Sequence, residues 1–125
     1  MAFKQFEEAL KNTDEIEITV TGRKSGRGIS RPVWFVYEDE ELYLLPVKGS
    51  DSDWYKNILK TPTMSLNAGG KPWSAEVKPV TDKAKVLKIV EKFKDKYGAD
   101  QVKKYYSKFD VAVYVPSSGT QRRSA

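Results

Sequence analysis

The sequence of 125 residues contains no cysteine and no histidine. The absence of cysteine excludes disulfide bonds, thiol nucleophiles and cysteine-ligated iron–sulfur clusters. With histidine absent as well, Cys/His zinc or haem ligation and Ser-His or Cys-His catalytic arrangements are excluded. Any chemistry must therefore use carboxylates, lysine, arginine, tyrosine, backbone groups or a bound cofactor.

Long apolar runs are missing too. No run approaches the roughly 20 residues that cross a bilayer, and the first residues, Met1-Ala2-Phe3-Lys4, show no signal-peptide core. We therefore expect a cytoplasmic protein without a transmembrane segment. The four consecutive acids from Glu38 to Glu41 cannot all point at one ion, so we expect no metal site.

The residues that are present suffice for one core. Hydrophobic residues make up 39% of the chain and aromatic residues 12%, which predicts a single domain over residues 1–125. The formal net charge is +5, and a basic protein suits an anionic partner. Acids are interleaved with the lysines of the C-terminal half, which argues against nucleic acid as that partner.

Hydrophobic periodicity predicts a mainly β, α+β fold. Predicted strands are 15–21, 31–37, 42–47, 63–68, 73–81 and 111–115. Predicted helices are 3–11, within an N-terminal segment 1–12, and 54–60, 82–97 and 100–108. Residues 116–125 form a polar tail that we expect to be flexible. The strands follow one another as hairpins without βαβ alternation, which favours an antiparallel barrel.

A basic loop rich in glycine follows the first predicted strand. Gly22, Gly26 and Gly28 surround Arg23, Lys24, Ser25 and Arg27. Such glycines let successive N–H groups point into one concavity, and arginine donates two hydrogen bonds to phosphate or carboxylate. A solvated hairpin loop is the alternative. Arg31 and Lys48 favour an anion site, because each flanks a strand end that could meet the loop at one opening.

The loop opens a longer series of motifs. The series is Thr21-Gly22-Arg23-Lys24-Ser25-Gly26, Arg31-Pro32-Val33, Lys48-Gly49, Trp54-Tyr55-Lys56-Asn57-Ile58 and Pro62. In this order and spacing, residues 16–80 resemble the deazaflavin-dependent nitroreductase family. The resemblance implies a split β-barrel like that of the FMN-binding proteins, with three or four short helices. It is also consistent with a homodimer.

The resemblance further implies a site for coenzyme F420. The residues implied for its phosphate and acidic tail are Arg23, Lys24, Arg27, Arg31 and Lys48, with Ser25 beside them. The backbone of Pro32 and Val33 would face its ring, and Trp54 and Asn57 would lie on the helix beside the cofactor groove. Val47 and Gly49 complete the residues expected to bind the cofactor. The sequence departs from the family at Ile29, where arginine is usual, and at Val47, where serine is common. The loop between Lys48 and Trp54 is also shorter.

Two tyrosines late in the chain are candidates for catalysis. Tyr105 and Tyr106 lie in a lysine-rich segment, and a hydroxyl there could protonate or orient an acceptor. Packing of a helix end is the alternative for each. Trp54 is the tryptophan expected at the ring, whereas Trp34 and Trp73 are expected in the core.

These observations predict an F420-dependent oxidoreductase that transfers a hydride to an electron-poor acceptor, such as a quinone, an enone or a nitro compound. The first alternative keeps the fold and binds FMN, whose single phosphate needs fewer cations. The second is a binding protein without turnover, for a flavin, a deazaflavin or haem. Phe3, Phe6 and Leu10 would cover a barrel end, or contact a membrane that holds a quinone.

Overall fold

The computed structural model describes residues 2–117, and its first sheet has the strand order β2-β1-β5-β6. The strands are β1 (Ile16–Thr21), β2 (Gly28–Val33), β5 (Thr63–Ala68) and β6 (Lys71–Glu76). All neighbours are antiparallel. In β1 and β5, apolar residues alternate with polar ones, so one face of the sheet is buried and the other meets solvent.

The second sheet has the order β3-β4-β8-β7 and is also antiparallel. Its strands are β3 (Phe35–Glu38), β4 (Glu41–Leu44), β7 (Lys78–Val80) and β8 (Ala112–Val115). Asp39 and Glu40 join β3 to β4 with positive φ angles of 52° and 64°. A two-residue turn of this kind matches the twist of the strands that it connects. The acidic segment is thus a hairpin turn.

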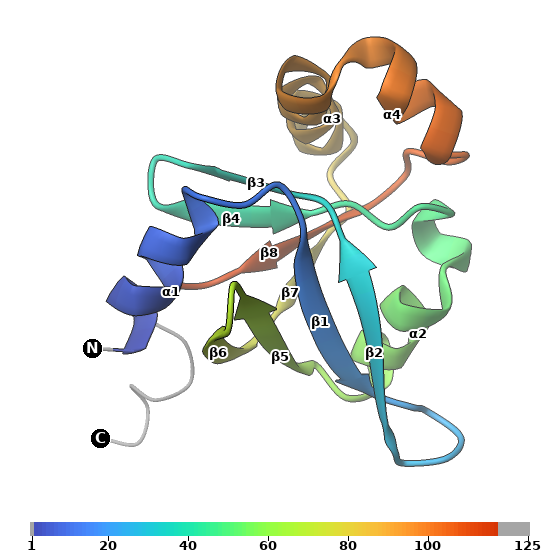
Figure 1. Cartoon of the computed structure of the whole chain (residues 1–125). Helices are drawn as coiled ribbons and strands as arrows, with labels where there is room; N and C mark the ends of the chain where they lie inside the picture. The colour runs from blue at the N-terminus through green and yellow to red at the C-terminus, as the bar shows by residue number, and fades with distance from the viewer. Residues whose placement is uncertain (1, 118–125) are drawn as a thin grey trace.

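Two predicted strands each proved to be two. Residues 31–37 divide at Trp34 between β2 and β3, and residues 73–81 divide at Val77 between β6 and β7. At both points the chain leaves one sheet and enters the other. The described residues therefore contain eight strands where the sequence indicated five or six. The two crossings give the split-barrel arrangement, in which two sheets share continuous segments of chain (Figure 1).

Four α-helices complete the fold of residues 2–117. They are α1 (Ala2–Leu10), α2 (Asp53–Lys60), α3 (Lys83–Tyr97) and α4 (Ala99–Tyr105), and a 3-10 turn η1 (Gly49–Asp51) precedes α2. The Asp82 carboxylate accepts a hydrogen bond from the backbone of Lys85 and caps α3, which ends at Gly98 with φ 99°. No helix among the described residues is long and apolar enough to cross a membrane. Residues 118–125 of the predicted tail lie outside the described residues.

Two apolar clusters hold the layers together. The first fills the space between the sheets and includes Phe6 of α1 and Ile58 of α2. The second joins the β3-β4-β8-β7 sheet to α3 and α4, with Phe93 fully buried. Phe6 and Leu10 therefore cover an end of the core, as predicted.

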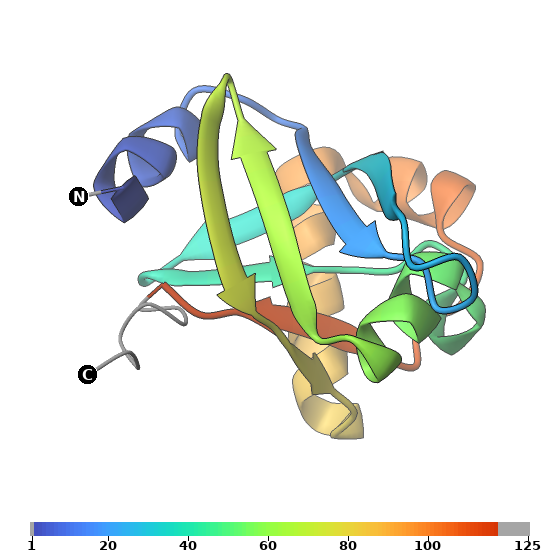
Figure 2. The same ribbon diagram turned by 90° about the horizontal axis from the view of Figure 1, so that it is seen from below.

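The arrangement places α2, α4 and the loop between β1 and β2 at one end of the molecule, and α1 at the opposite end (Figures 1 and 2). Strand β2 is an edge strand that begins at the loop after β1 and runs away from it (Figure 1). Segments far apart in the sequence thus meet at one surface, and the predicted site residues lie there.

Candidate functional site

A groove with two adjoining compartments lies at the end of the molecule formed by the loop, α2 and α4. A compartment of about 330 Å³ is beside the glycine loop, and one of about 730 Å³ lies between β2 and α4. Arg31, Asp53 and Trp54 line both compartments. A ligand long enough to occupy both would therefore pass these three residues, which we call the junction.

The smaller compartment is basic. It is lined by Gly22, Arg23, Lys24, Ser25, Ile29, Arg31, Asp53, Trp54 and Asn57. Three of these side chains are cations and one is an acid. Gly22 packs closely on Ser25, because a β-carbon at Gly22 would lie 2.7 Å from Ser25 Oγ and would displace that hydroxyl. The tight turn at Gly22 thereby brings the Ser25 hydroxyl and the Arg23 side chain to the same compartment.

The loop is fastened to α2 through Arg23. The buried Asn57 Oδ1 accepts from the Arg23 backbone N–H at 3.0 Å and from Arg23 Nη1 at 2.8 Å. Asp53 Oδ1 lies 3.5 Å from Arg23 Nη2, and Lys60 Nζ donates to the Arg23 carbonyl at 2.9 Å. Arg23 is thus engaged within the protein, and Asn57 positions the loop.

We expect Asn57→Ala to lower the free energy of unfolding by about 1.5 kcal/mol, because it removes the acceptor of two hydrogen bonds to Arg23. Urea unfolding followed by tryptophan fluorescence measures this. Lys56→Ala, at the exposed neighbouring position on α2, serves as the control and should change stability by at most about 0.5 kcal/mol. Equal effects of the two substitutions would contradict the positioning role of Asn57.

The larger compartment has aromatic and apolar walls with a charged rim. Its lining is Glu15, Arg31, Pro32, Val33, Trp34, Leu45, Val47, Lys48, Asp51, Ser52, Asp53, Trp54, Gln101, Tyr105 and Tyr106. The buried Ser52 hydroxyl accepts from the Lys48 backbone N–H at 2.8 Å, which fixes the start of the segment that leads to α2. Asp51 is paired with Lys108 at 3.1 Å.

Trp34 anchors the aromatic wall. Its ring stacks on Tyr97 with centroids 4.2 Å apart, and Tyr105 meets it edge-on at 5.6 Å. Tyr105 is half exposed, whereas Tyr106 is only 5% exposed and packs against Phe93 and Phe109. Burial raises the pKa of Tyr106 well above its ordinary value, so its hydroxyl stays protonated. Of the two tyrosines, Tyr105 offers the more accessible hydroxyl.

The groove brings together most of the predicted site residues. Those that line it are Arg23, Lys24, Ser25, Arg31, Pro32, Val33, Val47, Lys48, Trp54, Asn57, Tyr105 and Tyr106. Arg27 and Gly49 line neither compartment. Arg27 is exposed on the loop, and Gly49 is buried with a φ of 55° beside Asp110 and Lys108.

Two lining residues of consequence were not predicted from the sequence. Trp34, expected in the core, is half-buried and lines the larger compartment while it packs on the second cluster. Asp53 stands where a helix cap is expected, but Ser52 is the N-cap residue of α2 and makes no side-chain cap hydrogen bond. The Asp53 carboxylate instead pairs with Arg23 at 3.5 Å. Trp73 is buried as expected and packs against Phe3.

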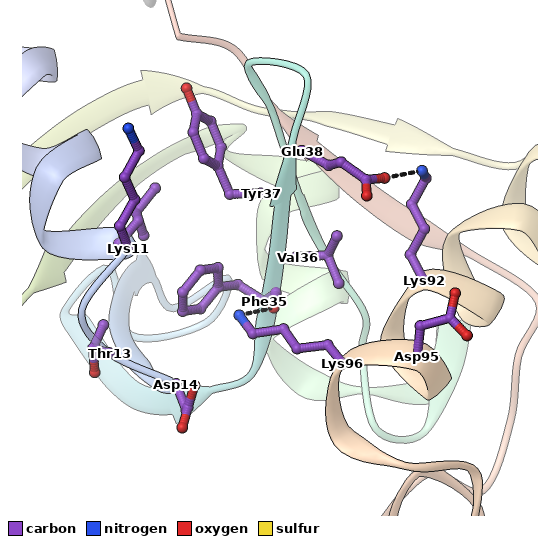
Figure 3. A pocket seen from close by; sticks show the side chains of 11 residues that line it. Lys11, Thr13, Asp14, Phe35, Val36, Tyr37, Glu38, Lys92, Asp95 and Lys96 are labelled. Carbon is purple, nitrogen blue, oxygen red and sulfur yellow. Dashed lines mark hydrogen bonds and ion pairs between the residues drawn. The ribbon is translucent and has the colours of Figure 1, made fainter.

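A separate cavity of about 470 Å³ lies between the end of α1, β3 and α3 (Figure 3). Three of its six charged side chains have partners within the protein. Lys92 pairs with Glu38, and Lys96 Nζ donates to the Phe35 carbonyl at 2.9 Å above the Phe35 ring. Lysines and acids of its lining balance in number, so this cavity lacks the positive charge of the groove. Among the described residues, no cluster of three or more metal-binding side chains is present.

A family model matches residues 7–113, which is most of the chain. The model is that of the DUF2255 family, described as an uncharacterized protein conserved in bacteria. The chain belongs to the DUF2255 family. A comparison with curated proteins gives no match to this DUF2255 chain.

Solved structures share the fold of this DUF2255 protein at low sequence identity. An F420-H2 dependent reductase (FDR-A) is 20% identical with a TM-score of 0.63, over 82% of this chain and 93% of that one. A protein described as a domain-swapped dimer is 20% identical with a TM-score of 0.64, over 90% and 94%. The haem storage protein HutZ from Vibrio cholerae is 11% identical with a TM-score of 0.66, over 90% and 86%.

These similarities confirm the predicted fold class. The two antiparallel sheets and their helices match the fold of these neighbours, in agreement with the split-barrel fold that the sequence resemblance implies. At identities of 20% and below, the similarity concerns the fold. The neighbours include a reductase and a haem storage protein, so the function of the DUF2255 chain must be argued from its own groove.

Proposed function

We propose that this protein binds a phosphate-bearing deazaflavin or flavin in the groove and acts as an oxidoreductase. The observation that carries the proposal is the adjoining pair of compartments, one basic and one aromatic, joined at Arg31, Asp53 and Trp54. A cofactor that combines a flat ring with a phosphate matches this pair, because its ring suits the aromatic compartment and its phosphate suits the basic one. The F420-H2 dependent reductase among the structural neighbours supports the choice of cofactor class.

The basic compartment fits a phosphate group. Lys24 and Arg31 are exposed and line it, and neither forms an ion pair within residues 2–117. Arginine and lysine bind phosphate through charge-assisted hydrogen bonds. Arg23, for which the family resemblance implies the same task, is already held by Asn57 and Asp53. We therefore assign the phosphate to Lys24 and Arg31 in the first place.

The aromatic compartment fits a ring system. Trp34, Trp54 and Tyr105 give it flat apolar surfaces, and Pro32 and Val33 form the β2 side. A bound deazaflavin or flavin would supply hydride transfer to an electron-poor acceptor such as a quinone, an enone or a nitro compound. The protein would hold the ring, exclude water and offer the Tyr105 hydroxyl as a proton donor or hydrogen-bond donor to the acceptor.

Coenzyme F420 is the first candidate and FMN the second. The sequence offered five cations for the long acidic tail of F420, but Arg27 lies outside the groove and Arg23 is engaged internally. Fewer cations therefore remain to bind an acidic tail, and the expected preference for F420 over FMN becomes smaller. A homodimer in the cytoplasm remains a prediction, and the neighbour described as a domain-swapped dimer supports the dimer.

The test is a titration of the purified protein with F420, FMN and riboflavin, followed by tryptophan quenching. Riboflavin is the control for the phosphate because it carries the same ring as FMN without the charge. We expect Arg31→Ala to weaken binding of F420 or FMN about tenfold, since a hydrogen bond to a charged group is lost. Riboflavin binding should change less than twofold.

The outcomes separate the alternatives. F420 binding with oxidation of the reduced cofactor by an added quinone or nitro compound would establish the proposed enzyme, and FMN binding alone would assign flavin chemistry to the same groove. Binding without turnover by any acceptor would point to a carrier, for which haem should be titrated as well. If F420, FMN and riboflavin all fail to quench tryptophan fluorescence or to raise the melting temperature, the proposal is wrong.

A further inference from the structure

One acidic side chain stands among the cations of the groove. Asp53 is the first residue of α2, and its side chain is 74% exposed. It lines both compartments together with Arg31 and Trp54. A ligand that extends from the aromatic compartment to the glycine loop must therefore pass its carboxylate.

The Asp53 carboxylate is held in this place by Arg23. Its Oδ1 lies 3.5 Å from Arg23 Nη2, and its backbone carbonyl accepts from Arg23 Nη1 at 3.3 Å. Arg23 is itself fixed by two hydrogen bonds to the buried Asn57. The acid is thus part of a connected unit of loop and helix, and it partly neutralises the cation nearest to it.

The net charge of the basic compartment follows from these residues. Its lining carries the cations Arg23, Lys24 and Arg31 and the acid Asp53, which gives a formal net charge of +2. A phosphate monoester carries a charge of about −1.5 to −2 near neutral pH. The balance matches one terminal phosphate, and each further negative charge on a ligand would meet the carboxylate at the junction.

We propose that Asp53 is a specificity-determining residue that weakens the binding of each ligand in proportion to its negative charge, so that it reduces the preference of the cations in the basic compartment for the longer anionic tail of F420 over FMN. The inference rests on the proposed function, since it concerns the anionic part of the same ligand. Asp53 acts by repulsion, which is how a binding site rejects a competitor that shares most of the favourable contacts. Its effect grows with the charge of the ligand, because the Coulomb energy is proportional to that charge.

The test compares the protein with its Asp53→Asn and Asp53→Glu variants. We expect Asp53→Asn to tighten binding of riboflavin less than twofold, FMN about threefold and the more anionic F420 about tenfold at low salt. Raising the salt concentration should reduce these gains. Asp53→Glu keeps the charge and should keep the wild-type order of affinities.

The control is Asp51→Asn. Asp51 lines only the larger compartment and is paired with Lys108, so its replacement should change the F420-to-FMN affinity ratio by less than twofold. An equal gain for all three ligands in Asp53→Asn, no gain, or the same gain in Asp51→Asn would overturn the inference.

Inorganic phosphate and tripolyphosphate separate this inference from the proposed function, because they carry charge without a ring. In a thermal-shift titration, Asp53→Asn should strengthen tripolyphosphate binding more than phosphate binding, by a ratio of about threefold. If this order appears while no flavin or deazaflavin binds, the role of Asp53 stands and the proposed cofactor is wrong. If flavins bind, but Asp53→Asn favours the more anionic ligand neither among the two phosphates nor among the cofactors, the proposed role of Asp53 is wrong.

Discussion

Replacing Phe93 by alanine is expected to lower the free energy of unfolding by about 3 to 5 kcal/mol, the usual cost of removing a buried aromatic side chain. Phe93 is fully buried in α3 and packs between the outer face of the β3-β4-β8-β7 sheet and the helices. Its ring lies 6.1 Å from that of Tyr97 and 6.2 Å from that of Tyr106. The cavity left behind would lie directly behind the aromatic wall of the groove.

Urea unfolding followed by circular dichroism measures this loss. Because small domains are stable by about 5 to 15 kcal/mol, Phe93→Ala could unfold the protein altogether, so Phe93→Leu provides a smaller step of about 1 kcal/mol. Leu87→Ala is the matched control on the same helix, since Leu87 is 53% exposed. Similar losses at positions 87 and 93 would show that α3 does not pack on the sheet as described.

The local elements of the fold could be predicted because their signals are local. The strand at residues 63–68 has its predicted bounds, since its alternation is flanked by Pro62 and by two glycines. The helix that begins after Asp82 and ends at Gly98 also agrees. In both cases a period and its end signals occur within one short stretch of sequence.

The division of two strands could not be predicted, because its cause is tertiary. Trp34 and Val77 stand inside continuous apolar or alternating runs, and neither is a glycine or proline that would signal a break. The chain bends there because the residues before and after each position pair with different sheets. Only the pairing partners, which lie far away in the sequence, determine where a run is divided.

The site shows the same limit. Residue type and spacing identified the cations of the glycine loop and Arg31 of β2, and Lys24 and Arg31 do line the groove. The partner of Arg23 could not be found in this way, because Asp53 and Asn57 are separated from it by 30 and 34 positions. The sequence therefore indicated a basic site but not which of its charges are available to a ligand.

Gly49 gives the second large effect that we expect. Its φ of 55° is in the left-handed region, and a β-carbon at this position would collide with Asp110 Oδ1 and lie 3.0 Å from Lys108 Cγ. Asp110 accepts from the Ser50 backbone N–H at 2.9 Å and from the Ser50 hydroxyl at 2.5 Å. Although burial opposes it, these hydrogen bonds lower the pKa of Asp110, so the carboxylate contributes to the join between η1 and the start of β8.

Gly49→Ala is expected to lower the free energy of unfolding by about 3 kcal/mol, the sum of left-handed strain and the loss of hydrogen bonds to a charged group. Gly26→Ala separates the two causes. Gly26 has a φ of 73°, and no atom lies within 4 Å of the place that a β-carbon would occupy, so only strain of about 1 kcal/mol should appear. When Asp110→Ala is added to Gly49→Ala, the collision is relieved. The second substitution should therefore lower the free energy of unfolding by less than Asp110→Ala does in the wild-type protein.

The consequence for the groove follows from where Gly49 lies. It stands between Lys48 and Ser52, which both line the larger compartment, and its backbone carbonyl accepts from the Ser52 N–H at 3.0 Å. A displaced Gly49 would move both lining residues, so Gly49→Ala should weaken ligand binding even where the variant remains folded, whereas Gly26→Ala should not. Equal stability of Gly49→Ala and Gly26→Ala would show that contact with Asp110 is not what requires glycine here, and that the segment before α2 adapts without cost.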